Sequence, residues 1–253
     1  MGEKLNGTVA LVTGASSGIG AAAATALAAH GAAVALVARR KERLETLAGE
    51  IRKQGGSALV VEADITQEKQ AYDAVARTVS ELGRLDTLVN AAGVMLLGPV
   101  LGAPMSEWQQ MVDINLLGTL YCCHAALPHL LRAAEQGPRR VSDLINVSST
   151  AGRFPRANRS GYNATKHAIT GFTEALRQEV TTKHVRVCVL EPGAVKTELI
   201  SHNRPEIREA VAKALQFEFL EAEDIGDAIA YIVTRPRRVA VNELLIRPTE
   251  QEG

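Results

Sequence analysis

Short apolar runs alternate with longer stretches of helical spacing along almost the whole chain. Runs such as TVALV and ALVV are nearly continuous in apolar residues, which is typical of strands buried on both faces of a sheet. Each run is followed by residues with helical periodicity. The pattern predicts strands at residues 8–14, 33–39, 58–64, 85–93, 142–149, 185–193 and 241–248, and helices at residues 18–30, 41–55, 67–82, 105–133, 160–182, 206–219 and 223–234.

The order of these elements predicts the fold class. Strands that alternate with helices form βαβ units, and successive units build a parallel sheet with helices on both faces. We therefore expect one α/β domain over residues 1–253, a doubly wound Rossmann fold with about seven strands. Residues 196–220 interrupt the pattern with His202, Asn203 and Pro205, so we expect a mobile loop and helix over a site there.

Composition narrows the class of protein. Of 253 residues, 46% are hydrophobic and 22% are charged, which is typical of a globular protein with a core. The 28 basic residues balance the 28 acidic residues, and 4% of residues are aromatic. Zero net charge provides no attraction to nucleic acid or an anionic membrane, and few aromatic side chains are available to stack on bases. We expect neither nucleic acid nor a membrane as a partner.

The cysteines and histidines indicate no metal site. Cys122, Cys123 and Cys188 are odd in number and lack zinc-like spacing, and the six histidines form no HExxH motif. Unpaired thiols are typical of a reducing compartment. The segment MGEKLNG lacks the apolar core of a signal peptide, and no apolar run reaches the ~18 residues of a membrane-spanning helix. We expect a soluble, cytoplasmic protein without a metal.

The segment TGASSGIG joins the first predicted strand to the first predicted helix. Its glycines, Gly14, Gly18 and Gly20, allow a tight turn and a close approach of the backbone to a ligand. The N-terminus of the helix presents free N–H groups that suit a phosphate, and doubly wound sheets bind ligands at the carboxyl ends of their strands. The segment predicts a dinucleotide site. The alternative is a tight strand-to-helix turn without a ligand.

The end of the second strand predicts which dinucleotide is bound. An acidic residue there contacts the ribose of NAD, whereas an arginine accommodates the 2′-phosphate of NADP. This chain has Ala38 followed by Arg39 and Arg40, and a guanidinium pairs with phosphate through its planar fork. Ser16 and Ser17 add hydroxyl donors. We expect NADP(H), with Arg39 as the first contact and Arg40 as a helper; the alternative is that both arginines begin a solvated helix.

Tyr162 and Lys166 lie four residues apart on a predicted helix, so their side chains share one face. A nearby ammonium favours the phenolate and lowers the pKa of a tyrosine, which makes the pair an acid–base candidate. Most pairs at this spacing are structural. Ser148 and Ser149 end the preceding strand and point in opposite directions, so one of them faces a site, where a hydroxyl would stabilise charge on a carbonyl oxygen.

These segments together resemble the short-chain dehydrogenase/reductase family. TGASSGIG resembles the family's TGxxxGxG loop, GYNATKHA contains its YxxxK motif, and the matches run in order through essentially the whole chain. The resemblance implies that Ser149, thirteen residues before Tyr162, is the catalytic serine and that Ser148 is structural. It also implies that Asn115 completes a catalytic tetrad and holds a water that links Lys166 to solvent.

The resemblance adds cofactor contacts at other strand ends. Asp64 matches the acidic residue beside the adenine, NAAG matches the family's NNAG except at Ala91, and Thr197 in EPGAVKT matches a residue that contacts the nicotinamide carboxamide. The backbone of Val195 is expected nearby. Residues and resemblance together predict the catalytic set Asn115, Ser149, Tyr162 and Lys166. They predict a cofactor site formed by Gly14, Ser16, Ser17, Gly18, Ile19, Gly20, Arg39, Arg40, Asp64, Ile65, Asn90, Ala91, Gly93, Tyr162, Lys166, Pro192, Gly193, Val195 and Thr197.

The activity that the resemblance implies is reversible hydride transfer between a nicotinamide and the carbonyl or alcohol group of a small metabolite. Tyr162 exchanges the proton, Lys166 lowers the tyrosine pKa and holds the nicotinamide ribose, and Ser149 polarises the carbonyl. No metal is required. Two alternatives are a non-catalytic NADP-binding redox sensor, and an alcohol or hydroxy-acid dehydrogenase that works in the oxidative direction.

The sequence indicates the substrate less clearly than it indicates the reaction. GVMLLGPV, AALPHLL, LRQEV and IRPT resemble the clavulanic acid dehydrogenase branch of the family, which reduces an aldehyde with NADPH. This does not transfer specificity, because binding pockets lie in variable loops. Candidate lining residues are Met95, Phe154, Leu199 and His202. Arg153, Arg156 and Arg159 either bind a substrate carboxylate or, more commonly for such a cluster, belong to a solvated or subunit-contact loop.

Assembly is expected from the same resemblance. Members of the family are commonly tetramers and less often dimers. We expect a homotetramer, or a homodimer, that assembles through the helices predicted near residues 105–133 and 160–182.

Overall fold

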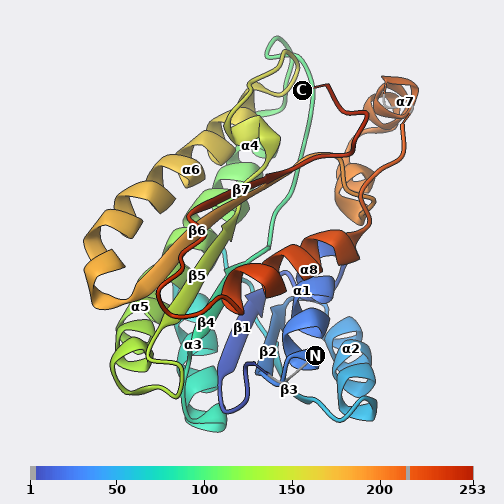
Figure 1. Ribbon diagram of the computed structural model, residues 1–253. Coiled ribbons are helices and arrows are strands. Elements are labelled where there is room, and N and C mark those ends of the chain that lie inside the picture. The colour runs from blue at the N-terminus through green and yellow to red at the C-terminus, as the bar shows by residue number, and fades with distance from the viewer. Residues whose placement is uncertain (1–3, 215–216, 253) are drawn as a thin grey trace.

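The computed structural model of the protein describes residues 4–214 and 217–252. These residues form one parallel sheet with helices on both sides (Figure 1). The sheet has 7 strands in the order β3-β2-β1-β4-β5-β6-β7. The strands are β1 (Val9–Thr13), β2 (Ala33–Ala38), β3 (Ser57–Glu62), β4 (Thr87–Asn90), β5 (Ser142–Val147), β6 (Val185–Pro192) and β7 (Glu243–Ile246). The predicted doubly wound Rossmann fold is confirmed.

Helices connect the strands, as the sequence pattern predicts. The α-helices are α1 (Gly18–Ala29), α2 (Lys41–Lys53), α3 (Glu68–Leu82), α4 (Met105–Met111), α5 (Gly118–Gln136), α6 (Ser160–Val180), α7 (Pro205–Ala214) and α8 (Ala222–Val233). The described residues also contain the short 3-10 helices η2 (Thr150–Gly152), η3 (Thr181–Lys183) and η4 (Glu198–His202).

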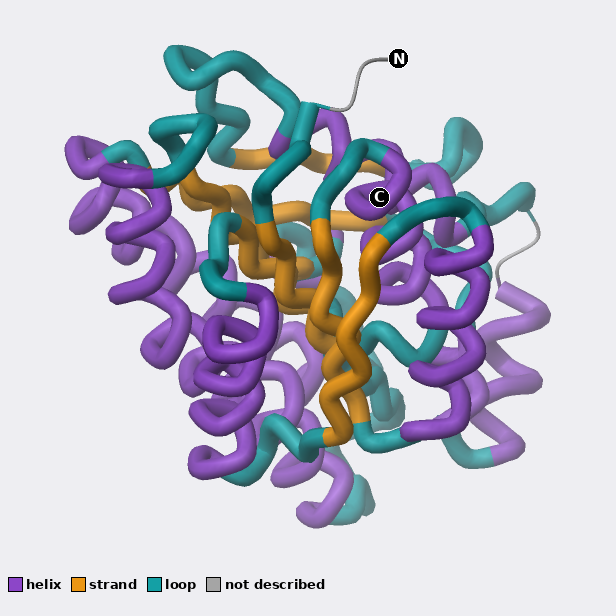
Figure 2. Tube along the Cα trace, turned by 90° about the horizontal axis from the view of Figure 1, so that it is seen from below, coloured by secondary structure: helices purple, strands orange, loops and turns teal. Residues whose placement is uncertain are grey.

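Alternating side chains of the strands divide the core into two layers. On β1, Ala10 and Val12 pack with α1, α2 and α8, whereas Leu11 packs with α3, α5 and α6. This division follows from the two-residue period of a strand. Figure 2 shows the strands between the helices of the two layers. Burial of both faces accounts for the continuous apolar runs.

The long helix predicted at residues 105–133 is interrupted in the structure. α4 passes into a π-helical segment, η1 (Val112–Leu117), before α5 begins. Such π-helical turns are frequent at functional sites, and periodicity in the sequence does not reveal them. The whole stretch Met105–Gln136 is long and apolar enough, by length and composition, to cross a membrane. α5 packs against α3 and the sheet through residues that include Cys122, Ala126 and Leu130.

Residues 196–220, the segment predicted to cover a site, begin and end next to each other in the structure. Val195 and Leu220 pair in a parallel β-bridge, and η4 and α7 lie between them. Of the helix predicted at residues 206–219, the structure describes α7 up to Ala214, and residues 215 and 216 lie outside the described part of the chain. The mobility of this segment stays a prediction.

The strand order reverses between β1 and β4. The chain continues from β1 to β2 and β3 on one side, and from β4 to β7 on the other. At such a switch point the connecting loops diverge and leave a crevice at the carboxyl ends of the strands. The glycine-rich loop after β1 and residues 91–93 after β4 therefore border one crevice.

Candidate functional site

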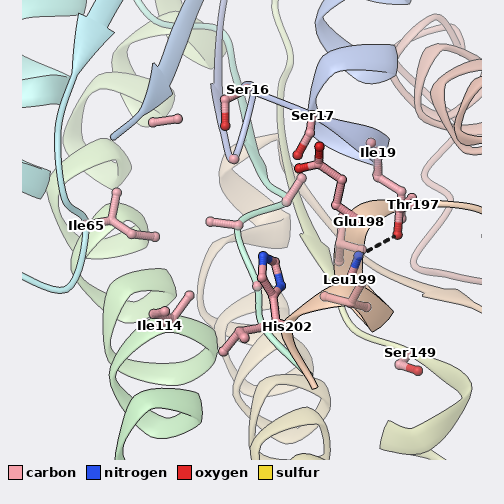
Figure 3. A pocket seen from close by; sticks show the side chains of 18 of the residues that line it. Ser16, Ser17, Ile19, Ile65, Ile114, Ser149, Thr197, Glu198, Leu199 and His202 are labelled. Atoms are coloured by element: carbon pink, nitrogen blue, oxygen red, sulfur yellow. Dashed lines mark hydrogen bonds between the residues drawn. The ribbon is translucent and has the colours of Figure 1, made fainter. Parts of the chain in front are cut away.

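A cavity of about 330 Å³ lies at this switch point, and loops that follow β1 to β6 line it. Figure 3 shows Ser16 and Ser17 on its wall together with Thr197, Leu199 and His202. The predicted site residues that line it are Gly14, Ser16, Ser17, Gly18, Ile19, Arg39, Arg40, Asp64, Ile65, Ala91, Gly93, Ser149, Tyr162, Lys166, Pro192, Gly193, Val195 and Thr197. Gly20, Asn90 and Asn115 are predicted site residues that lie outside its lining.

The glycine-rich loop forms a cradle that side chains would fill. Gly14 has a φ of +69°, and a Cβ atom there would lie 2.7 Å from the Cα of Ala92. A Cβ atom at Gly20 would lie 2.4 Å from the carbonyl oxygen of Gly14, so this glycine allows α1 to pack onto the loop. Ser17 precedes α1 without a capping hydrogen bond from its side chain. The first N–H groups of α1 therefore remain suited to a phosphate of a dinucleotide.

The end of β2 presents two arginines to the cavity. Arg39 is exposed at the rim. Arg40 donates to Ser16 Oγ from Nε at 3.0 Å and from Nη2 at 2.9 Å, and to Ser17 Oγ from Nη2 at 2.7 Å. Guanidinium and hydroxyl donors match a phosphate monoester, and Ala38 stands where a carboxylate would contact the ribose of NAD. These residues fit NADP(H).

Asp64 and Ile65 follow β3 on another wall of the cavity. Asp64 Oδ1 accepts hydrogen bonds from the N–H of Thr66 at 3.1 Å and from its hydroxyl at 2.8 Å, which holds the carboxylate at the strand end. Ile65 also packs on the start of α5, where a Cβ atom at Gly118 would lie 2.8 Å from its Cδ1. Both residues line the cavity, and their contact with the cofactor stays a prediction.

The position of Asn90 differs from the predicted cofactor contact. Its buried side chain donates from Nδ2 to Asn146 Oδ1 at 2.9 Å and to Cys123 Sγ at 3.2 Å. Because side chains alternate along a strand, this residue points into the interior rather than into the crevice. The next residue, Ala91, lines the cavity, and its N–H donates to Thr13 Oγ1 at 3.2 Å.

Tyr162 on α6 and Ser149 after β5 are joined by a hydrogen bond between their side chains. Ser149 is the N-cap of η2, where its Oγ accepts from the N–H of Ala151 at 3.1 Å. Ser148 donates instead to the carbonyl oxygen of Lys166 at 3.1 Å. Both serines line the cavity, Ser149 beside Tyr162, and the catalytic role of Ser149 stays a prediction.

Burial controls the protonation of the tyrosine. Tyr162 is 5% exposed, and burial raises its pKa to about 12 against the opposing influence of Ser149 and the charge of Arg159. Burial also lowers the pKa of Lys166, to about 8, and the predicted lowering of the tyrosine pKa by this lysine stays a prediction. At neutral pH Tyr162 is therefore a phenol, the form that donates a proton to a carbonyl oxygen.

Asn115 and Lys166 approach each other beside Gly93. A Cβ atom at Gly93 would lie 3.4 Å from Asn115 Oδ1 and 3.8 Å from Lys166 Nζ. The Asn115 amide accepts from the N–H of Val94 and donates to its carbonyl oxygen, both at 2.8 Å. These bonds attach the π-helical segment to the chain that follows β4. The predicted role of Asn115 in holding a water stays a prediction.

Only some of the residues predicted to line the substrate side of the cavity are found there. Leu199 and His202 line it, whereas Met95 packs in an apolar cluster and Phe154 is 44% exposed beside Arg247. Sequence reasoning missed the lining residues Val94, Gln110, Ile114 and Glu198. Gln110 and Ile114 are four residues apart, a spacing that places both side chains on one face of a helix.

Arg153 is engaged within the protein rather than available to a substrate. Its Nη2 lies 3.0 Å from Glu191 Oε2, and it also pairs with Glu243. Glu191 is 0% exposed and precedes Pro192, which lines the cavity. The ion pair therefore joins the turn after Ser149 to the end of β6.

Replacing Arg153 with Met is expected to lower the free energy of unfolding by about 2 kcal/mol, less than for a fully buried pair because the arginine is 37% exposed. Burial raises the pKa of Glu191, and Arg153 opposes that shift. A raised folded-state pKa makes the charged carboxylate destabilising, so the deficit should shrink as the pH falls and Glu191 is protonated. Urea unfolding at several pH values measures this loss of unfolding free energy. When Glu191 is already replaced by Gln, the Arg153→Met substitution should cost much less. An equal loss in that background would contradict the assignment of the effect to the Arg153–Glu191 pair.

Three comparisons place these observations among known proteins. The family model described as short chain dehydrogenase matches residues 8–208. Glycine betaine reductase ATRR of Emericella nidulans is 37% identical over 250 residues, which is 98% of this chain and 19% of that protein. The chain thus spans about a fifth of that relative. An uncharacterized oxidoreductase of Staphylococcus aureus is 35% identical over 244 residues, 96% of this chain and 98% of that protein.

Solved structures agree with the fold and differ in the nucleotide they contain. A serine dehydrogenase complexed with NADP+ superposes with a TM-score of 0.87 at 30% identity and covers 97% of each chain. A 3-ketoacyl-(acyl-carrier-protein) reductase from Brucella melitensis complexed with NADH has a TM-score of 0.83 at 32% identity and covers 96% of this chain and 98% of that one.

Proposed function

The chain belongs to the short-chain dehydrogenase family, and we propose that it is an NADPH-dependent oxidoreductase that reduces a carbonyl group of a small metabolite. The observation that carries the proposal is the meeting of Ser149, Tyr162 and Lys166 on the same cavity as the glycine-rich loop and Arg39. The candidate proton donor Tyr162 and the glycine-rich loop that fits a dinucleotide therefore line the same cavity.

Each residue has a role in this proposal. The nicotinamide supplies the hydride when it is bound. Ser149 donates a hydrogen bond to the carbonyl oxygen and stabilises the charge that develops there. Tyr162 transfers its proton to the same oxygen as a general acid. Lys166 would hold the nicotinamide ribose, and Asn115 would support the proton path behind it.

Preference for NADPH is proposed from the arginines after β2. Replacing Arg39 with Ala should weaken NADPH binding about tenfold and leave NADH binding nearly unchanged, because only NADPH has a phosphate for the guanidinium. Calorimetric titration of both nucleotides measures the two affinities. Lys53→Ala, at the far end of α2, is the matched control. Equal losses for NADPH and NADH in Arg39→Ala would contradict the assignment.

A substrate panel tests the proposed activity. Purified protein is mixed with aldehydes, ketones and keto acids, and the absorbance of NADPH or NADH is followed; alcohols and hydroxy acids are tested with NADP+. Turnover of carbonyls with NADPH supports the proposal. Tight NADPH binding without turnover of any compound would favour a redox sensor, and turnover of alcohols alone would favour the oxidative direction.

A homotetramer, or a homodimer, is proposed as the assembly. Val100, Leu101 and Met105 are large apolar side chains that are 58%, 92% and 69% exposed at and before the start of α4, and contact with another subunit would cover them. Light scattering of the purified protein gives its mass. A monomer at micromolar concentration would contradict the proposal.

A further inference from the structure

The carboxylate of Glu198 lies among the groups proposed to bind the 2′-phosphate of NADPH. Glu198 is the first residue of η4, and its Oε2 accepts from Arg40 Nη1 at 2.8 Å while its Oε1 accepts from Arg43 Nη1 at 2.6 Å. Arg40 is the same side chain that binds the hydroxyls of Ser16 and Ser17. Figure 3 shows the carboxylate of Glu198 near Ser17 on the wall of the cavity.

The guanidinium groups that bind the Glu198 carboxylate can also bind another anion with several acceptor oxygens. Two guanidinium groups surround Glu198 and lower its pKa to about 2, so it is charged throughout the neutral pH range. A phosphate monoester also presents negative oxygen atoms and pairs with guanidinium groups and hydroxyls. Two anions that share Arg40 repel each other, so the carboxylate and a phosphate compete for this group.

We propose that Glu198 is an internal competitor for the 2′-phosphate subsite and thereby limits how strongly the protein prefers NADPH over NADH. This inference rests on the proposed use of NADP(H). A nucleotide with a 2′-phosphate displaces the Glu198 carboxylate from Arg40, whereas a nucleotide without that phosphate leaves both ion pairs of Glu198 in place.

Displacement of Glu198 also acts on the substrate side of the cavity. Leu199 and His202, which follow on η4, line the cavity. The far end of η4 is anchored, because Asn203 accepts from the N–H of Leu97 at 2.7 Å and donates to the carbonyl oxygen of Met95 at 2.8 Å. NADPH therefore loosens one end of a segment whose other end stays attached, and NADH does not.

Binding of NADPH and NADH to Glu198→Gln tests the proposal. The substitution removes the charge and keeps the shape of the side chain. Two exposed ion pairs are lost, so NADPH affinity should rise about three- to tenfold while NADH affinity changes less than about twofold. Glu206→Gln on α7 makes the same charge change in the same segment without contacting α2, and should alter neither affinity. Calorimetry measures both constants without any turnover.

The outcomes separate this inference from the proposed function. Wild-type protein that binds neither nucleotide would overturn the proposed function and the inference with it. Wild-type binding with an unchanged NADPH-to-NADH affinity ratio in Glu198→Gln would overturn the inference alone. Weaker NADPH binding in Glu198→Gln would also overturn it, because Glu198 would then organise the arginines rather than compete for them.

Hydrogen–deuterium exchange of residues 198–203 provides a second readout. In the wild type, exchange should be faster with NADPH bound than with NADH bound, because only NADPH releases Glu198. In Glu198→Gln this difference should disappear. Equal exchange with the two nucleotides in the wild type would overturn the inference.

Discussion

Replacing Tyr162 with Phe is expected to lower kcat/KM for carbonyl reduction about 10²- to 10⁴-fold, which is the range for loss of a general acid. The substitution removes the hydroxyl and keeps the ring, which is 5% exposed in an apolar cluster with Val94, Leu96 and Met111. The fold and the nucleotide cradle should therefore be unaffected. Initial rates with NADPH give the loss, and calorimetric titration should show NADPH affinity within about twofold of the wild type.

The matched control for this variant is Tyr231→Phe. Tyr231 lies on α8, is 51% exposed, and does not line the cavity. Loss of its hydroxyl should leave kcat/KM unchanged. A Tyr162→Phe protein that retains near wild-type turnover would assign the proton transfer to another group. A variant that loses NADPH binding as well would indicate that the hydroxyl serves the fold or the nucleotide rather than the chemistry.

Replacing Gly14 with Ala is expected to destabilise the protein by about 2–4 kcal/mol, the sum of a left-handed backbone at a residue with a Cβ atom and of overpacking. The φ of Gly14 is +69°, and the new Cβ atom would lie 2.7 Å from the Cα and 2.8 Å from the N of Ala92. Both contacts are with backbone, so no rotamer relieves them. The loop after β1 must move away from the chain after β4, and this opens the proposed nucleotide cradle.

NADPH affinity and the midpoint of thermal unfolding measure this effect, and both should fall. Gly49→Ala is the control, because Gly49 lies inside α2 and a Cβ atom there would meet nothing within 4 Å. In a helix interior this change should raise stability by about 1 kcal/mol. A Gly14→Ala protein with wild-type stability and affinity would show that the loop adapts easily and is not the rigid cradle described above.

Much of the fold followed from local patterns in the sequence. The apolar runs near residues 8–14 and 185–193 predicted strands that the structure contains, because burial of both faces of a sheet needs continuous apolar residues. The observed strand boundaries differ from the predicted ones by one or a few residues, because a strand ends where its hydrogen bonding in the sheet ends. An example is β4 (Thr87–Asn90), which was predicted at residues 85–93. The π-helical segment Val112–Leu117 was not predicted, since it depends on how the chain packs around Asn115.

Most of the candidate site was also predictable, because its residues lie at strand ends. Tyr162 and Lys166 share a helix face by spacing alone, and the loop after β1 needs glycines wherever a backbone packs against it. Side-chain direction was harder to predict. Asn90 belongs to the right loop region but points into the sheet, where Asn146 binds it.

The sequence by itself determined the order of strands and helices, the glycine-rich loop and the Tyr162–Lys166 pair, since each depends on residues close together along the chain. The tertiary structure decided the burial of Tyr162, which raises the pKa of its hydroxyl. It also decided the pairing of Arg40 with Glu198, which are 158 positions apart in sequence. Such contacts depend on how distant segments pack, and no spacing rule along the chain predicts them.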